Sequence, residues 1–137
     1  MLKQISVFVE NKPGRLAAVT EKLYDENINI RAFTIAEAGD FGIIRMIVDR
    51  TDKALKILKE SGFTVTLTDV LGIEVEDRPG ELYKIAKALG DEKINIEYVY
   101  AFTFGKDKAV IIFKVNKPDK AVEILKNKGF KLSLIHI

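Results

Sequence analysis

The 137-residue sequence contains no cysteine, no tryptophan and a single histidine. Without cysteine, disulfides, thiolate nucleophiles and cysteine-ligated metals are excluded. The histidine, His136, is the penultimate residue, and a lone histidine is more typical of a surface than of a metal ligand or a base. The acidic residues are spread out and form no Asp/Glu–His cluster. We therefore expect no catalytic residues, no metal and no cofactor.

Long apolar runs are also lacking, because no stretch reaches the roughly 18 residues of a membrane-spanning helix. Met1 is followed by a strand-like alternation and not by a charged segment and an apolar core. We therefore expect a cytoplasmic protein without a signal peptide or a membrane partner. Charge of one sign is not in excess either, since the formal net charge is only +2. This balance is not typical of a nucleic-acid-binding protein, although the sequence pI of about 8.7 leaves room for a local basic patch.

A six-residue motif is present twice. It reads Asn-Lys-Pro-Gly-Arg-Leu from Asn11 to Leu16 and Asp-Arg-Pro-Gly-Glu-Leu from Asp77 to Leu82. In both places it lies between a strand-like and a helix-like run, where Pro suits the first helical position and the Asx residue can accept from free N–H groups. The glycine allows another molecule to approach the backbone, and helix N-termini bind anions readily. The alternative is a turn that only starts a helix.

The hydrophobic pattern of the first half predicts the order β-α-β-β-α-β. Apolar residues alternate in the first run and recur at helical spacing after Pro13-Gly14. The expected elements are a strand over 2–10, a helix over about 13–26, a strand from 28 towards 37, a hairpin turn over 38–40, a strand over 42–48, a helix from Thr51 to Gly62 and a strand over 63–67.

The second half repeats this order, which indicates an internal duplication. Landmarks recur 66 residues later up to the hairpin and 67 residues later after it, so we expect a one-residue insertion in the second hairpin turn. A fourth helix begins at Pro118, and a last strand covers 130–137. The sequence thus predicts an α+β protein with two ferredoxin-like units, 1–67 and 68–137, each an antiparallel sheet with helices on one face. No linker separates the units, which we expect to pack on each other.

Several strands are apolar on both faces, although such a unit covers only one face with helices. We therefore expect a second cover, from the other unit or from a second chain, and a homodimer or higher oligomer. Tyr98, Tyr100, Phe102 and Phe104 alternate along one strand. This stripe can line an apolar pocket or form a subunit contact, and we favour the contact.

The repeated Pro-Gly turns, the Ile-Asn-Ile openings at Ile28–Ile30 and Ile94–Ile96, and the βαββαβ order resemble ACT domains. These are small regulatory modules that bind amino acids at an interface between modules. The duplication is similar to the free-standing tandem ACT proteins, and the similarity covers nearly the whole chain. It implies an amino-acid ligand that contacts the strand-to-helix loop of one module and a strand of its neighbour.

The resemblance also implies a set of ligand-binding residues. Asn11 and Asp77 would shape the loops and face the ligand's ammonium group, and free N–H groups after the prolines would bind its carboxylate. Asn29 and Asn95 are expected beside the loop, or else are ordinary turn residues. The full set is Asn11, Pro13, Gly14, Arg15, Leu16, Asn29, Asp77, Gly80, Glu81, Leu82 and Asn95. Because Arg15 is cationic where Glu81 is anionic, we expect the first loop to bind a carboxylate more tightly.

Three functions remain open. The first is an amino-acid sensor without chemistry of its own, since no phosphate-loop, nucleophile-elbow or dinucleotide motif suggests an enzyme. The second is a regulatory subunit or interaction protein that docks on a biosynthetic enzyme of amino-acid metabolism. The third is RNA binding, because RNA recognition motifs share this order of elements. Residues 40–45 resemble that pattern only faintly and residues 106–109 lack the aromatic, so we expect no nucleic-acid partner.

Overall fold

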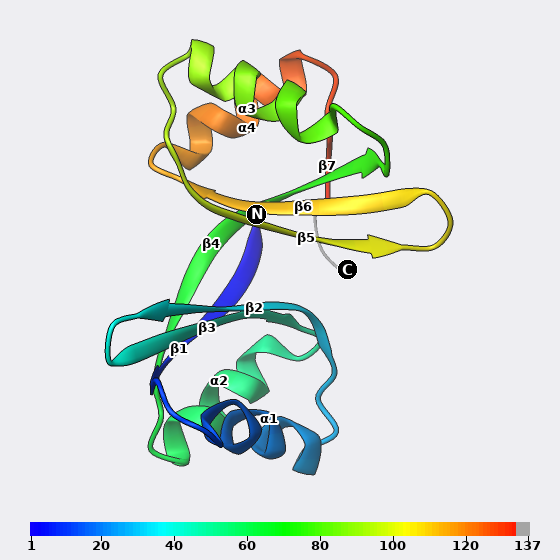
Figure 1. Ribbon diagram of the computed structural model, residues 1–137. Coiled ribbons are helices and arrows are strands. Elements are labelled where there is room, and N and C mark those ends of the chain that lie inside the picture. Colours follow the sequence, from blue (N-terminus) through cyan, green and yellow to red (C-terminus); the bar gives the residue numbers. More distant parts are fainter. Residues whose placement is uncertain (134–137) are drawn as a thin grey trace. The chain divides into compact units, whose positions relative to one another are not determined.

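Residues 1–133 are described by the computed structural model of the chain, and they form two compact units (Figure 1). Lys3–Thr68 make up the first unit, whereas Met1–Leu2 and the described residues from Asp69 onward belong to the second. One strand, Thr64–Glu76, runs through the boundary and serves both units in turn. The absence of a linker is therefore visible as an uninterrupted strand.

The first unit has the order β-α-β-β-α-β that the sequence predicts. Its elements are β1 (Leu2–Glu10), α1 (Arg15–Asp25), β2 (Ile30–Ala38), β3 (Phe41–Val48), α2 (Thr51–Glu60) and the first part of β4 (Thr64–Glu76). The strands lie in the order β2-β3-β1-β4, so β2 forms one edge of the sheet. Both helices lie on the same side of this sheet (Figure 1).

The second unit repeats this arrangement. After the second part of β4 it contains α3 (Glu81–Asp91), β5 (Ile96–Phe104), β6 (Lys108–Val115), α4 (Pro118–Asn127) and β7 (Lys131–Leu132). Its strand order is β7-β4-β6-β5, which places β5 at the edge that β2 occupies in the first unit. The expected fold class, two ferredoxin-like units with antiparallel sheets, is confirmed. His136 and the end of the expected last strand lie outside the described residues.

Each unit has its own hydrophobic core between the helices and one sheet face. The helices contribute fully buried residues one turn apart, such as Val19 with Leu23 in α1 and Ile85 with Leu89 in α3. Alternate strand residues oppose them, namely Ile5, Val7, Ile44 and Met46 in the first unit and Leu71, Ile73, Ile111 and Phe113 in the second. The amphipathic patterns in the sequence therefore correspond to real buried faces.

The hairpins differ by the one residue that the sequence predicts. Two residues, Gly39 and Asp40, separate β2 from β3, whereas three residues, 105–107, separate β5 from β6. The extra length is accommodated by positive backbone φ angles at Gly105 and Asp107. The insertion changes only the tip of the hairpin, where it disturbs no ladder.

The aromatic stripe lies on the sheet face opposite the helices. Tyr98, Tyr100 and Phe102 pair with Lys114, Ile112 and Val110, whose neighbours Ile111 and Phe113 point into the helix-covered core. The first three aromatic side chains are half-buried, and Phe104 is 40 % exposed. The stripe therefore faces away from the helices of its unit.

Candidate functional site

The strand-to-helix loops have the same backbone in both units. Each helix is preceded by a glycine in the left-handed region, Gly14 with φ 89° and Gly80 with φ 95°. The helices begin one residue later, so Pro13 and Pro79 lie outside them and do not occupy the first helical position that the sequence suggested. A left-handed glycine at the cap explains this difference, because it turns the chain before the helix starts.

The first turn of α1 leaves backbone donors free. Its first helical bond runs from Ala18 N to Gly14 O at 3.0 Å. Within residues 1–133, no side chain caps this end, and the N–H groups of Arg15, Leu16 and Ala17 have no acceptor. Such an end favours a negatively charged group.

Asn11 fastens the first loop to the β2–β3 hairpin. Its backbone N–H donates to Asp40 O at 2.9 Å, and its amide Nδ2 donates to Gly39 O at 3.1 Å. Asp77 keeps only the backbone bond, to Asp107 O at 2.9 Å, because a carboxylate has no N–H to donate. Asn11 therefore shapes its loop by a contact that Asp77 cannot make.

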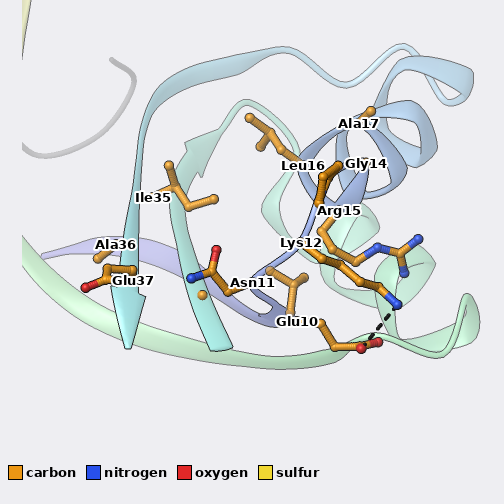
Figure 2. Close-up of a pocket in the computed structure, with 13 residues that line it drawn as sticks. Glu10, Asn11, Lys12, Gly14, Arg15, Leu16, Ala17, Ile35, Ala36 and Glu37 are labelled. Atoms are coloured by element: carbon orange, nitrogen blue, oxygen red, sulfur yellow. Dashed lines mark ion pairs between the residues drawn. The ribbon is translucent and has the colours of Figure 1, made fainter. Parts of the chain in front are cut away.

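A cavity of about 540 Å³ lies between the first loop and the end of β2 (Figure 2). We call it the first cavity. Leu16 from α1 and Ile35 from β2 point toward one another across it, and Asn11 lies below both in this view. Its lining comprises Val9, the loop from Glu10 to Ala17, Ile35, Ala36, Glu37 and Gly42. The cavity therefore offers apolar walls beside the free N–H groups of a helix.

The sheet register brings β2 to the loop. Val9 and Glu37 both pair with Gly42 of β3, so the ends of β1 and β2 lie at the same end of the sheet, on either side of β3. Gly42 has no side chain, and a Cβ there would meet Val9 Cγ2 at 3.6 Å. The absence of a side chain at Gly42 therefore leaves more room in the first cavity.

The two cations of the first loop extend away from the cavity. Lys12 Nζ pairs with Glu10 at 3.2 Å, and both Lys12 and Arg15 point to the side opposite Ile35 (Figure 2). The Arg15 Nε is buried and has no hydrogen-bond partner in the described part of the chain. Arg15 therefore borders the first cavity but directs its charge elsewhere.

The charged side chains at the second loop form ion pairs with one another. Arg78 Nε donates to Glu81 Oε1 at 2.6 Å, and Lys84 Nζ lies 3.6 Å from the same oxygen. The hydrogen bond from Arg78 lowers the pKa of the Glu81 carboxyl below its ordinary value, although desolvation acts in the opposite direction. Glu81 is 8 % exposed, whereas Arg15 at the equivalent position is half-buried. The helix of the second loop thus begins with a carboxylate of its own.

The second cavity is smaller, at about 290 Å³. It lies beside the second loop, and its lining includes Asp77, Glu81, Leu82 and Ala101. Ala109 stands where the first unit has Gly42, since it pairs with Thr103 as Gly42 pairs with Glu37. The structure therefore places a similar but narrower hollow at the repeated motif.

Asn29 and Asn95 are not brought to the loops. Each lies just before its strand, at the end remote from the hairpin turn that Asn11 contacts. Their backbone N–H groups donate to Asp49 Oδ1 and Asn116 Oδ1, both at 3.0 Å, and their side chains are exposed. β2 and β5 begin at this end and reach the loops only at their other end.

The sequence did not predict two parts of the lining of the first cavity, namely Ile35 to Glu37 of β2 and Gly42 of β3. The signal was available in the strand order: β1 and β2 flank β3, both antiparallel to it, so both must finish at the same end. The other predicted residues of the first loop, from Asn11 to Leu16, all line the first cavity.

Two features are not found in the part of the chain that the structure describes. No group of three or more His, Asp or Glu side chains is placed to hold a metal ion. A membrane-spanning helix is likewise not found among the four helices, none of which has the length and apolarity required.

Comparison with solved structures identifies relatives of different distance. Protein BT0572 from Bacteroides thetaiotaomicron is 46 % identical, with 96 % of this chain and 91 % of that chain covered and a TM-score of 0.90. The regulatory subunit of aspartate kinase from Thermus thermophilus is 18 % identical over 91 % of this chain and 90 % of that one, with a TM-score of 0.66. At that identity the likeness shows the fold alone.

A third similarity is to part of a larger protein. Aspartate kinase from Synechocystis is 18 % identical, with 98 % of this chain but only 27 % of that chain covered and a TM-score of 0.61. No curated protein sequence matches. The family described as an ACT domain pair matches residues 1–136. The chain therefore belongs to the ACT domain pair family.

Proposed function

We propose that this protein is an amino-acid sensor without catalytic activity, and that the ligand occupies the first cavity. The observation that carries the proposal is the combination of apolar walls, Leu16 and Ile35, with free N–H groups at the start of α1. An amino acid has a carboxylate for the helix end and a side chain for the walls. Membership of the ACT domain pair family supports the same ligand class.

A thermal-shift screen against the twenty amino acids tests the proposal. A ligand present at 100 times its dissociation constant adds about 2.7 kcal/mol to the free energy of unfolding, which raises the melting temperature measurably. We expect one amino acid, or a few of related shape, to give such a shift. A flat response to all twenty would contradict the sensor function.

A matched pair of variants locates the site. Ile35→Trp places a large ring in the first cavity, on an exposed edge strand where aromatic residues are well tolerated. Ala101→Trp makes the same change at the equivalent place in the second unit. We expect only Ile35→Trp to abolish the shift. If Ala101→Trp abolishes it instead, the ligand occupies the second cavity.

We also propose that the protein self-associates. The edge strand β2 carries Phe33 and Ile35, which are 57 % and 49 % exposed. Unpaired edges with apolar side chains favour pairing with another chain. The stripe from Tyr98 to Phe104 is the other candidate surface, since Phe104 is 40 % exposed, and either surface agrees with a homodimer.

Light scattering at micromolar concentration tests this point. We expect a dimer or a larger assembly for the natural sequence and a smaller mass for Phe33→Glu. Tyr24→Glu is the control, because Tyr24 is 81 % exposed on α1, away from the sheet edge. A monomeric natural protein would exclude self-association, and an unchanged mass in Phe33→Glu would exclude β2.

The alternative function is that of a regulatory subunit that docks on a separate enzyme of amino-acid metabolism. Its support is the exposed edge of β2 and the shared fold with the regulatory subunit of aspartate kinase from Thermus thermophilus. An amino-acid screen without response, together with a purified kinase whose inhibition depends on this chain, would favour docking over sensing.

A further inference from the structure

We propose that the first unit has a second ligand site, formed around Arg15, which binds a small carboxylate with an aromatic body. The site is a hollow of about 420 Å³ beside the first cavity, with which it shares Val9, Glu10 and Arg15. We call this hollow the Arg15 pocket. It is lined by Phe8, Val9, Glu10, Arg15, Phe41 and the segment 61–64. All of these residues belong to the first unit.

No acidic side chain among residues 1–133 forms an ion pair with Arg15. Lys12 forms an ion pair with Glu10, and the side chain of Arg15 extends away from the first cavity (Figure 2). Its Nε is buried without an acceptor in residues 1–133. A guanidinium held in this way is normally paired with a carboxylate or phosphate, because an unmet buried donor is costly. The Arg15 guanidinium therefore remains available to an anion from outside the chain.

The second unit supplies the comparison. Its equivalent hollow is lined by Glu74, Glu76, Arg78, Glu81, Phe104, Lys108 and residues 129–131. There the charges are paired within the chain: Arg78 with Glu81, Lys108 with Glu76, and Lys131 with Glu74. At the position of Arg15 the second unit thus has a carboxylate in place, and it needs no external anion.

The neighbours of Arg15 define the body of the ligand. Phe8 and Phe41 are 43 % and 58 % exposed, and Phe63 is half-buried. The second unit has Glu74 and Lys108 at the places of Phe8 and Phe41, because Glu74 lies 66 and Lys108 67 residues further on. Exposed rings beside a guanidinium suit a flat apolar group that ends in a carboxylate. Phosphate alone would leave the rings uncovered.

Phenylacetate is a suitable probe, and phenylacetamide is its neutral counterpart. Isothermal titration of the full chain at low ionic strength compares the two, since the contribution of a charged contact is screened by salt. We expect saturable binding of phenylacetate and binding about tenfold weaker for phenylacetamide. Equal affinities for the two probes, or no saturable binding of phenylacetate, would overturn the proposal.

Two variants assign the charge to Arg15. Arg15→Met keeps a long side chain and good helix propensity but removes the guanidinium. Lys12→Met is the matched control, because it removes the neighbouring cation, which already pairs with Glu10. We expect Arg15→Met to weaken phenylacetate binding about tenfold, and Lys12→Met to change it less than threefold. Equal effects of the two variants would overturn the assignment.

A third variant distinguishes binding in the Arg15 pocket from binding in the first cavity. Phe41→Ala removes an exposed ring of the Arg15 pocket that does not line the first cavity. We expect it to weaken phenylacetate binding about fivefold and to leave any amino-acid thermal shift unchanged. Unchanged phenylacetate binding in Phe41→Ala would overturn the role of the rings. Failure of the amino-acid screen alone would leave the Arg15 pocket unaffected, since the two sites are measured with different ligands.

Discussion

The two strand-to-helix loops share a backbone and differ in how their charges are neutralised. Both have a left-handed glycine before the helix and a backbone bond from the Asx residue to the hairpin. In the second loop Arg78, Lys84 and Glu81 form a closed set of ion pairs. In the first loop Lys12 turns back to Glu10, and Arg15 has no partner within residues 1–133. The charged side chains of the second loop are therefore paired with one another, whereas Arg15 of the first loop is not paired with any side chain of its loop.

The difference extends to the space beside each loop. The first cavity is nearly twice as large as the second, at about 540 against 290 Å³. Gly42 in its floor corresponds to Ala109 in the second unit. A repeated backbone therefore does not imply a repeated site, because small side-chain changes alter both the room and the charge.

The largest expected effect tests whether the cores are equivalent. Leu23→Ala and Leu89→Ala remove the same side chain from equivalent helix positions, where the exposed fractions are 1 % and 0 %. We expect each to lower the free energy of unfolding by about 3 kcal/mol, because a buried cavity is created. Urea denaturation measures both. A difference of more than about 2 kcal/mol between them would show that the units differ in their cores as well as in their loops.

The next effect concerns the ligand. Leu16→Ala shortens a wall of the first cavity, and Leu82→Ala makes the same change in the second. We expect Leu16→Ala to weaken binding of the amino acid that stabilises the protein by about tenfold, because apolar contact is lost. Leu82→Ala should leave this affinity unchanged. Titration calorimetry measures the amino-acid affinity of both variants. Equal losses of affinity would mean that both cavities bind the amino acid.

A smaller effect tests the shared backbone. Gly14→Ala and Gly80→Ala each add a Cβ at a position with positive φ and with no atom within 4 Å of that Cβ. We expect each to lower the free energy of unfolding by about 1 kcal/mol, from backbone strain alone. Alanine at a helix position with ordinary φ, as in Gly90→Ala, is the control and should not destabilise the protein. A cost at only one loop would show that the backbones are not equivalent.

The smallest effect is a pH dependence that only the second loop should have. The Arg78 hydrogen bond lowers the pKa of Glu81 below its ordinary value of 4.5, so the folded state favours the ionised carboxylate. This stabilisation is fully present above pH 4.5 and is lost as the pH falls through the lowered value. We expect Glu81→Gln to be less stable than the natural protein at pH 7, with a difference that shrinks toward pH 3. Thermal unfolding across this range is the measurement.

Glu21→Gln is the control for the pH experiment. Glu21 is exposed on α1 and forms no ion pair among the described residues. Its replacement should change the melting temperature little at any pH. If Glu81→Gln and Glu21→Gln behave alike, the ion pairs of the second loop make no net contribution to folding.

The fold followed from the sequence because many weak signals agreed. The 66-residue recurrence, its change to 67 after the hairpin, and the alternation of apolar residues all indicated one duplicated unit. The order of the elements and the insertion in residues 105–107 agree with these signals, whereas individual bounds differ, as in β4, which continues to Glu76. Helix starts were less accurate, since Pro13 looks like a first helical residue until the positive φ of Gly14 is known.

The site was predictable only in part. The sequence singled out the first loop, Asn11 to Leu16, which lines the first cavity, because a repeated Pro-Gly turn is a local feature of the sequence. Ile35 and Gly42 were missed because they reach the loop through pairing across β3, and register is a long-range property. The direction of the Arg15 side chain, away from Ile35, was equally hidden, since a rotamer cannot be read from the sequence.

Leu2 gives the duplicated chain an unexpected kind of interdependence. It is 4 % exposed, and it groups with the residues from Asp69 onward although it opens the first strand. Its Cδ1 lies 2.7 Å from where a Cβ of Gly72 would be, so the side chain rests directly on that glycine's backbone. If the chain were divided between the two repeats, Leu2 would be on the N-terminal fragment, whereas the glycine that it contacts would be on the C-terminal fragment. We therefore expect a deletion of Met1 and Leu2 to destabilise the second unit, which contains Gly72.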